Sequence, residues 1–378
     1  MRITKKFAPA VIAAALSITL LAACGGNSSA DDKPASDADL AKYADAVAAA
    51  KADVATYTAE QAPVEVPALG TPAKPGLKLV VLTCAFPVCR AGTDPAVEAA
   101  KTLGWDVFNA QYDFTPEGYA AGWTSALQQD PEAVIYVAGF PQDVAKDQIA
   151  EAHDRGIPLV AVSYNAPSLE AAGTAYAVNG APELAESGRL MGQTIVADAG
   201  GPTDVLFVWD PTLTNTLTPV KNAMTDAVEK AGVKVQTLEV SIATVGKEIP
   251  GQVTTYLQRH PEIKYVAIAL ADLGAGVPQA LASVGMADKV KIVSRAPQGA
   301  DLAQIKSGEQ FASVAEEIAA SGYRAVDDVI RLSNGEDVLD TDPVGWHQIM
   351  VKDNVTQTDG PQPTPGVPDA FYEAWGLG

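Results

Sequence analysis

Residues 78–92 read Lys-Leu-Val-Val-Leu-Thr-Cys-Ala-Phe-Pro-Val-Cys-Arg-Ala-Gly, and this stretch decides the fold. Its first half, Leu79–Leu82, is a short apolar run with a β-branched middle, which is typical of a buried parallel strand. Pro87 ends the run, and Asp94 and Pro95 offer an N-cap and a first-turn proline, which predicts a helix beginning there. In open α/β sheets ligands bind at the carboxyl ends of strands, so we expect the intervening loop to form one wall of a ligand cleft.

Strand and helix patterns alternate from Lys78 onward, and the alternation restarts once. The expected strands are 78–83, 105–111, 133–138, 158–163 and 174–179 in the first run, and 204–209, 234–240, 265–270 and 290–294 in the second. The expected helices are 94–103, 116–128, 143–154, 183–197, 218–231, 248–259 and 275–284. A strand at 310–314, a helix at 317–332 and a strand at 347–351 follow. Two such runs predict an α/β fold with two doubly wound parallel-sheet lobes.

Residues 1–23 have the pattern of an export signal. They contain three cations, no acid and an apolar segment that is too short to span a bilayer comfortably. Leu21-Ala22-Ala23-Cys24 resembles the lipobox of bacterial lipoproteins, whose cysteine is lipidated. An ordinary signal peptide that happens to have a cysteine here is the alternative. A lipid on Cys24 would hold the protein at the outer face of the cell membrane without spanning it, so we expect an extracytoplasmic, membrane-anchored protein.

The chain is strongly acidic. Its formal net charge is -20, and without the three cations of residues 1–23 the remainder carries -23. Such a surface repels nucleic acid and anionic lipid headgroups, so neither is an expected partner. A length of 378 residues suggests about two domains, and a hydrophobic share of 48% is ample for their cores.

Cys84 and Cys89 are the two cysteines that remain once Cys24 carries lipid. In an oxidising compartment this even pair favours a disulfide, which would rigidify the loop more than it stabilises the fold. Two reduced core cysteines or a metal site are the alternatives. A metal site needs further Cys or His ligands, and the three histidines of the chain are scattered, so no metal is expected.

The two ends of the chain are expected to carry no chemistry. The composition of residues 24–76 predicts a polar tether, then an exposed Ala-rich helix at 40–57 and a stiff Pro-rich linker at 63–76. Residues 357–378 form a Pro-rich tail in which Phe371, Tyr372 and Trp375 fall on one helical side. That pattern is more often a packing contact with the body of the protein than a site.

The order of these elements resembles the type I periplasmic binding proteins, the ribose-binding-like solute receptors of ABC transporters. The resemblance covers about residues 77–351 and is strongest at 133–162 and 292–329. There Ile305-Lys306-Ser307-Gly308, followed by Phe311–Glu316, resembles the family's passage from a helix through glycine to a strand. The Cys-Ala-Phe-Pro-Val-Cys loop and the Pro-rich leader resemble a subgroup from actinobacterial genomes.

The resemblance implies two discontinuous lobes joined by a three-segment hinge. The implied N-terminal lobe is 77–181 with 317–345, and the implied C-terminal lobe is 182–316 with 346–356. The hinge crossings are expected near 179–182, 316–320 and 340–346.

The family's ligand contacts carry over only by position, at the carboxyl ends of strands. The implied residues are Phe86, Phe140, Ser163, Tyr164, Trp209, Thr214, Asn215, Asp272, Arg295 and Glu316. Where the family often has Gly-Phe-Asp, this chain has Ser294-Arg295-Ala296, and at the last crossing Glu316 replaces a glutamine. A sugar site needs several carboxylates and amides between aromatic faces, and this chain lacks two of the acids. We expect Arg295 to pair either with a ligand carboxylate or with Glu316.

These features predict a monomeric solute-binding lipoprotein that delivers a sugar, or another small polar or aromatic molecule, to the permease of an ABC importer. The alternative is a sensor of the same fold that presents its ligand-bound state to a membrane receptor or kinase. The sequence contains no nucleophile elbow, P-loop, dinucleotide glycine pattern or His-x-x-x-His pair. We therefore expect neither catalysis nor a cofactor.

Overall fold

The structure is a computed structural model that describes residues 41–163, 176–338 and 345–378. The export signal, Cys24 and Tyr164 lie outside the described residues. Among the helices that are described, none combines the length and the apolar character needed to cross a bilayer.

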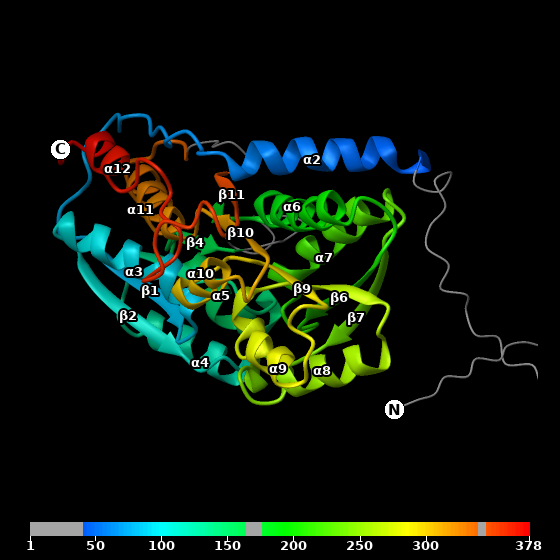
Figure 1. Cartoon of the computed structure of the whole chain (residues 1–378). Helices are drawn as coiled ribbons and strands as arrows, with labels where there is room; N and C mark the ends of the chain where they lie inside the picture. Colours follow the sequence, from blue (N-terminus) through cyan, green and yellow to red (C-terminus); the bar gives the residue numbers. More distant parts are fainter. Residues whose placement is uncertain (1–40, 164–175, 339–344) are drawn as a thin grey trace, which may run out of the picture. The chain divides into compact units, whose positions relative to one another are not determined.

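The first lobe is built on a sheet of five parallel strands within the described residues (Figure 1). They are β1 (Lys78–Cys84), β2 (Asp106–Tyr112), β3 (Ala133–Val137), β4 (Leu159–Val162) and β5 (Tyr176–Val178). Their order across the sheet is β2-β1-β3-β4-β5. The connecting helices are α3 (Pro87–Thr102), α4 (Pro116–Leu127), η1 (Gln142–Ala145) and α5 (Lys146–Asp154). Every residue of β1 except Lys78 is buried, as expected for a strand with helices on both faces of its sheet.

The second lobe repeats this arrangement with six strands in the described part of the chain. They are β6 (Asp204–Trp209), β7 (Lys234–Glu239), β8 (Ile263–Ile268), β9 (Lys291–Arg295), β10 (Ala312–Glu316) and β11 (His347–Met350), in the order β11-β10-β9-β8-β6-β7. Only β11 is antiparallel to its neighbour. The helices are α6 (Ala181–Ala199), α7 (Thr214–Glu229), η2 (Ile242–Thr244), α8 (Ile249–Arg259), η3 (Ala271–Gly274), α9 (Val277–Ser283) and α10 (Gly299–Ser307). The predicted α/β fold with two parallel-sheet lobes is confirmed.

The chain passes between the lobes more than once. It leaves the first sheet between β5 and α6, since α6 packs against α7 and β9. It returns between β10 and α11 (Ile318–Asn334), because α11 packs against α3 and β4. The approach of α11 to α3 is close: a Cβ on Gly322 would lie 2.5 Å from the carbonyl oxygen of Gly92. A third passage leads from α11 to β11, and part of it, residues 339–344, lies outside the described residues.

Two helices begin earlier than the sequence pattern predicts. The predicted starts at 94 and 218 were wrong, because α3 begins at Pro87 and α7 begins at Thr214. In both cases a proline that suits the first turn of a helix, Pro95 or Pro219, lies inside the helix instead. In α3 the N1 position is taken by Pro87. Both helices therefore extend further toward the carboxyl ends of the preceding strands than expected.

The segment before β1 packs onto both lobes. In α2 (Ala44–Thr58), which lies alongside α6 in Figure 1, Val47 and Ala50 are buried, so the helix is only partly exposed. Its end is held to the second lobe, because the Gln348 side chain donates a hydrogen bond of 2.8 Å to the Ala59 carbonyl. The Pro-rich stretch then packs on the first lobe, where Arg331 of α11 donates a 2.9 Å bond to the Pro67 carbonyl.

The C-terminal tail packs on α11. It ends in α12 (Asp369–Ala374), where Phe371 stacks on Tyr323 with ring centroids 5.7 Å apart. The indole Nε1 of Trp375 donates a 2.8 Å bond to the buried Asp327 carboxylate. The aromatic side chains of the tail therefore serve packing, as their spacing indicates.

Candidate functional site

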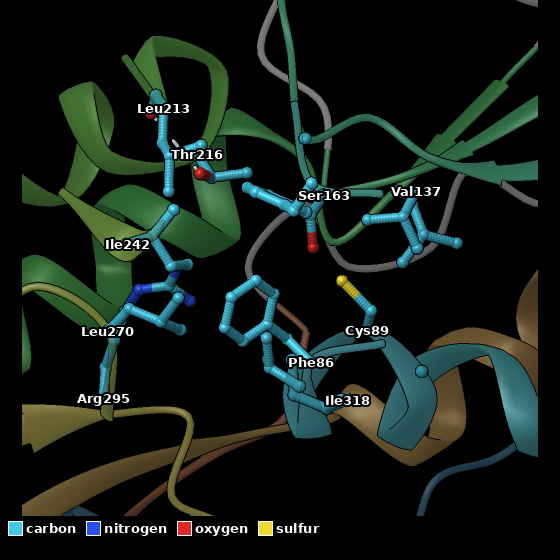
Figure 2. A pocket seen from close by; sticks show the side chains of 15 residues that line it. Phe86, Cys89, Val137, Ser163, Leu213, Thr216, Ile242, Leu270, Arg295 and Ile318 are labelled. Carbon is cyan, nitrogen blue, oxygen red and sulfur yellow. Dashed lines mark hydrogen bonds between the residues drawn. The ribbon is translucent and has the colours of Figure 1, made fainter. Parts of the chain in front are cut away.

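A cavity lies where the two lobes meet, and both lobes contribute to its wall (Figure 2). Its described lining residues are Phe86, Val88, Cys89, Gly92, Phe114, Val137, Gly139, Val162, Ser163, Leu213, Thr216, Ile242, Leu270, Arg295 and Ile318. Each is the last residue of a strand or belongs to the loop or helix start that follows one. This is the edge at which open α/β sheets bind ligands. The geometry therefore marks this cavity as the candidate site.

A disulfide holds Phe86 at the cavity wall. It joins Cys84, the last residue of β1, to Cys89 in α3, with Cα atoms 5.6 Å apart, and this confirms the predicted pairing. Because the bridge encloses so few residues, it restricts the turn that carries Phe86 more than it stabilises the whole fold. The Phe86 ring meets the edge of Phe114, with centroids 5.2 Å apart, and Phe114 contacts Phe140 at 5.0 Å. These rings form one aromatic cluster at the end of the first sheet.

Arg295 and Glu316 form a buried ion pair beside the cavity. Arg295 Nη1 lies 2.8 and 2.9 Å from the two carboxylate oxygens of Glu316, and its Nε donates to the Ala269 carbonyl at 2.9 Å. The two side chains are 4% and 1% exposed, so water screens the pair very little. Burial raises the pKa of Glu316, but the Arg295 charge and the surrounding donors more than offset this and leave the pKa lowered. Of the two expected partners of Arg295, the structure shows the internal one.

Glu316 also connects the other passages between the lobes. Ser187 of α6 donates a hydrogen bond of 2.5 Å to its carboxylate, and the Asn179 side chain donates one of 3.3 Å. His347 of β11 lies 3.0 Å from the Ser187 hydroxyl, measured from its Nε2. The first two passages therefore meet at the Glu316 carboxylate, and His347 of the third is linked to it through Ser187.

Two of the predicted ligand residues contact the opposite lobe directly. The Asn215 side chain donates a 2.9 Å hydrogen bond to the Phe140 carbonyl. The Asp272 carboxylate is bonded by the backbone of Val88, while its Oδ2 is buried without a partner among the described residues. Burial, and secondarily the charge of Asp301, raises the pKa of Asp272 to about 6. The lobes are therefore closed around the cavity.

The remaining predicted residues lie at different distances from the cavity. Ser163 lines it, and its hydroxyl is bonded by Asn179 at 3.3 Å. Trp209, at the end of β6, is buried outside the lining, with the Lys221 ammonium 3.9 Å from its ring centroid. Thr214 is exposed in the first turn of α7. As ligand contacts, all of them remain predictions.

Three residues at the carboxyl ends of strands hold a positive φ without being glycine. They are Ser163 after β4 (60°), Asn179 after β5 (53°) and Ala296 after β9 (52°). This conformation is uncommon for such residues and persists only where the surroundings hold it. The backbone N–H of Ala296, for example, donates a 2.8 Å bond to the Val314 carbonyl. Local strain thus gathers at the same edge of the sheets as the cavity.

Several lining residues were not predicted. They include Phe114, Leu213, Ile242, Leu270 and Ile318. Each follows the carboxyl end of a strand, so the strand pattern contained the signal. Aliphatic side chains at those positions look like core residues, whereas positional carry-over from the family favoured polar and aromatic ones.

Residues 91–337 match the model of a family described as a periplasmic binding protein domain. No curated protein sequence matches the chain.

Solved structures with a similar fold come from several bacteria. An ABC transporter solute-binding protein from Agrobacterium vitis, bound with alpha-D-tagatopyranose, is 17% identical with a TM-score of 0.66, covering 74% of this chain and 96% of that one. A glucose-galactose binding protein from Geobacillus stearothermophilus is 20% identical with a TM-score of 0.65, covering 75% and 100%. A Mycobacterium smegmatis solute-binding protein with bound glycerol is 19% identical with a TM-score of 0.65, covering 76% and 100%. Identities this low show a shared fold alone.

Breaking the buried ion pair should destabilise the protein strongly. Arg295→Met leaves the Glu316 carboxylate buried without its cation, so we expect the free energy of unfolding in urea to fall by about 3–5 kcal/mol. The double variant Arg295→Met with Glu316→Met should recover most of that loss, because no unpaired charge remains. Arg90→Met is the control, since Arg90 pairs with Asp94 at 3.1 Å on an exposed face of α3 and its loss should cost about 1 kcal/mol or less. Equal losses for the two single variants would contradict this account.

The Asp272 carboxyl should make stability depend on pH. Its pKa is raised from 3.8 to about 6 in the folded protein, so the folded state binds the proton more tightly than the unfolded state does. This contribution is complete below about pH 4 and is lost as the pH rises through about 6. We expect Asp272→Asn to gain roughly 2 kcal/mol over the wild type between pH 4.5 and pH 7.5. Melting curves at both pH values test this, with the exposed Asp143→Asn as control. A gain that does not change with pH would contradict it.

Proposed function

Because the chain belongs to the periplasmic binding protein domain family, we propose that it captures a small solute between its two lobes and delivers it to an ABC importer. The observation that carries this proposal is the cavity at which the carboxyl ends of strands from both sheets converge. Closing two lobes over a solute removes it from water and creates a shape that a transporter recognises. The Agrobacterium vitis protein of the same fold, described as an ABC transporter solute-binding protein, supports the importer as the partner.

Members of this family bind solutes outside the cytoplasm and are not enzymes, so the chain is a binding protein and the prediction of no catalysis is confirmed. Its affinity would come from the apolar wall and a few converging polar groups. The contacts of Asn215 with Phe140 and of Asp272 with Val88 would form on closure and hold the lobes together.

We also propose that the protein is a lipoprotein anchored through Cys24. The lipobox-like residues 21–24 support this. The short stretch between Cys24 and α2 would serve as the tether. A monomer is sufficient for this role, because one chain contains both halves of the cavity.

Cys24→Ser should release the protein from the membrane. Without the acyl acceptor there is no lipid to hold it, so we expect the variant in the soluble extracytoplasmic or culture fraction and the wild type in the membrane fraction. Immunoblots of the two fractions measure this. Ser28→Ala is the matched control and should stay with the membrane. A Cys24→Ser variant that remains membrane-bound would contradict the lipid anchor.

Solute capture is tested by equilibrium dialysis of the full chain carrying Cys24→Ser, purified without detergent. The dialysis mixture contains sugars, polyols, organic acids and neutral ring compounds, and mass spectrometry identifies what is retained. We expect one chemical class to be retained at no more than one molecule per chain. Thr216→Trp, which fills the cavity, should abolish retention, while Thr218→Trp, outside the lining, should not. Retention of nothing, or equal retention by the two variants, would overturn the proposed function.

A further inference from the structure

The described wall of the cavity is almost entirely apolar. Phe86 and Phe114 contribute aromatic surface from the first lobe, and Leu213, Ile242 and Leu270 contribute aliphatic surface from the second. Figure 2 shows the Phe86 ring directed toward Ile242 and Leu270. A flat or compact apolar group placed between the lobes would therefore contact a hydrophobic surface on both sides.

The polar side chains of the described wall are few, and each already makes at least one hydrogen bond within the protein. Ser163 accepts a bond from Asn179 at 3.3 Å, and the Thr216 hydroxyl donates to the Leu213 carbonyl at 3.4 Å. Arg295 is the third. A sugar brings several hydroxyl groups, and each one buried without a partner weakens binding. The described residues thus offer the several hydroxyl groups of a sugar few hydrogen-bonding partners.

Arg295 offers the cavity a donor without a net charge. Glu316 neutralises the guanidinium through Nη1, and Nε is used by the Ala269 carbonyl, so among the described residues no hydrogen bond engages Nη2. A ligand carboxylate would compete with Glu316 for one guanidinium and add a second buried negative charge beside it. Asp272, which accepts a hydrogen bond from the backbone of the lining residue Val88 and interacts electrostatically with Arg295, would repel it further. A neutral acceptor meets neither obstacle.

We propose that the solute is a neutral aromatic or alicyclic ring compound with one hydrogen-bond acceptor, such as a carbonyl group, and that it is not a sugar. The ring lies between Phe86 and the aliphatic wall, and the acceptor receives the N–H groups of Arg295 Nη2. This inference rests on the proposed function, because it names the solute of the same cavity.

The test uses matched probes on the full chain carrying Cys24→Ser, in detergent-free buffer. Cyclohexanone and acetophenone are neutral rings with one carbonyl, benzoate keeps the aromatic ring but carries a carboxylate, and glucose and glycerol are the sugar and polyol. We expect isothermal titration calorimetry to show the two ketones binding at least tenfold more tightly than the other three. Glucose, glycerol or benzoate binding as tightly as the ketones would overturn the inference. So would the failure of both ketones to bind.

Two variants of β4 test where the ketones bind. Val162→Thr places a hydroxyl in the cavity wall with little change in volume, and it should weaken acetophenone binding roughly tenfold, because the ring would bury that hydroxyl. Val160→Thr makes the same change on the same strand and in the same core cluster, outside the lining, and should leave the affinity unchanged. Equal affinities for the two variants would overturn the inference. A sugar retained in the dialysis would sink the inference and leave the proposed function standing, whereas retention of nothing would sink both.

Discussion

The carboxylate of Glu316 is the constraint on which the arrangement of the two lobes depends. A buried negative charge is tolerated only when its surroundings supply a cation and donors. Here Arg295 supplies the cation, and Ser187 and Asn179 supply hydrogen bonds from the first passage between the lobes. His347, which follows the third passage, contacts Ser187 and is thereby linked to the same carboxylate. Because these partners come from distant parts of the sequence, satisfying one charge fixes how three passages lie beside one another.

A second buried carboxylate in the same region, that of Glu317, also has a cationic partner. Glu317 pairs with Arg324 at 2.8 Å and accepts a bond of 3.4 Å from the backbone N–H of Trp346. Glu183, on α6, has no such cation among the residues that the structure describes, and burial together with the charges of Glu317 and Glu316 raises its pKa to about 7. The hinge therefore holds two paired acids and a third that is partly protonated at neutral pH. Adding another charge there would upset this balance.

The fold was predictable because short apolar runs, typical of buried strands, alternate in the sequence with segments that have a helical pattern. Leu79–Leu82 and the runs that follow it set both sheets, and the position of Phe86 beyond β1 placed one wall of the cavity. The early starts of α3 and α7 were not predictable. Pro95 and Pro219 each suit the first turn of a helix, so the sequence pattern places the helix start there, whereas in the structure both prolines lie inside their helices.

The chemistry of the candidate site was harder to predict than its location. Ile242 and Leu270 have the same side chains as the core, and only the tertiary structure separates a residue that faces a cavity from one that faces another helix. Arg295 had two credible partners in the sequence, and the choice between them depends on its register beside Glu316 on neighbouring strands. Comparing sequence positions with a family locates the site. Which side chains line the cavity depends on how the folded chain packs.

The segment before β1 has a mechanical consequence. It is bonded to the second lobe at Ala59 and to the first lobe at Pro67, so it links the two lobes in addition to the three passages of the hinge, as the C-terminal tail does between β11 and α11. When the lobes separate, residues 60–66 must lengthen, and an extended chain reaches at most about 3.6 Å per residue. For as long as both hydrogen bonds hold, the length of this segment would set an upper limit on the separation of the lobes.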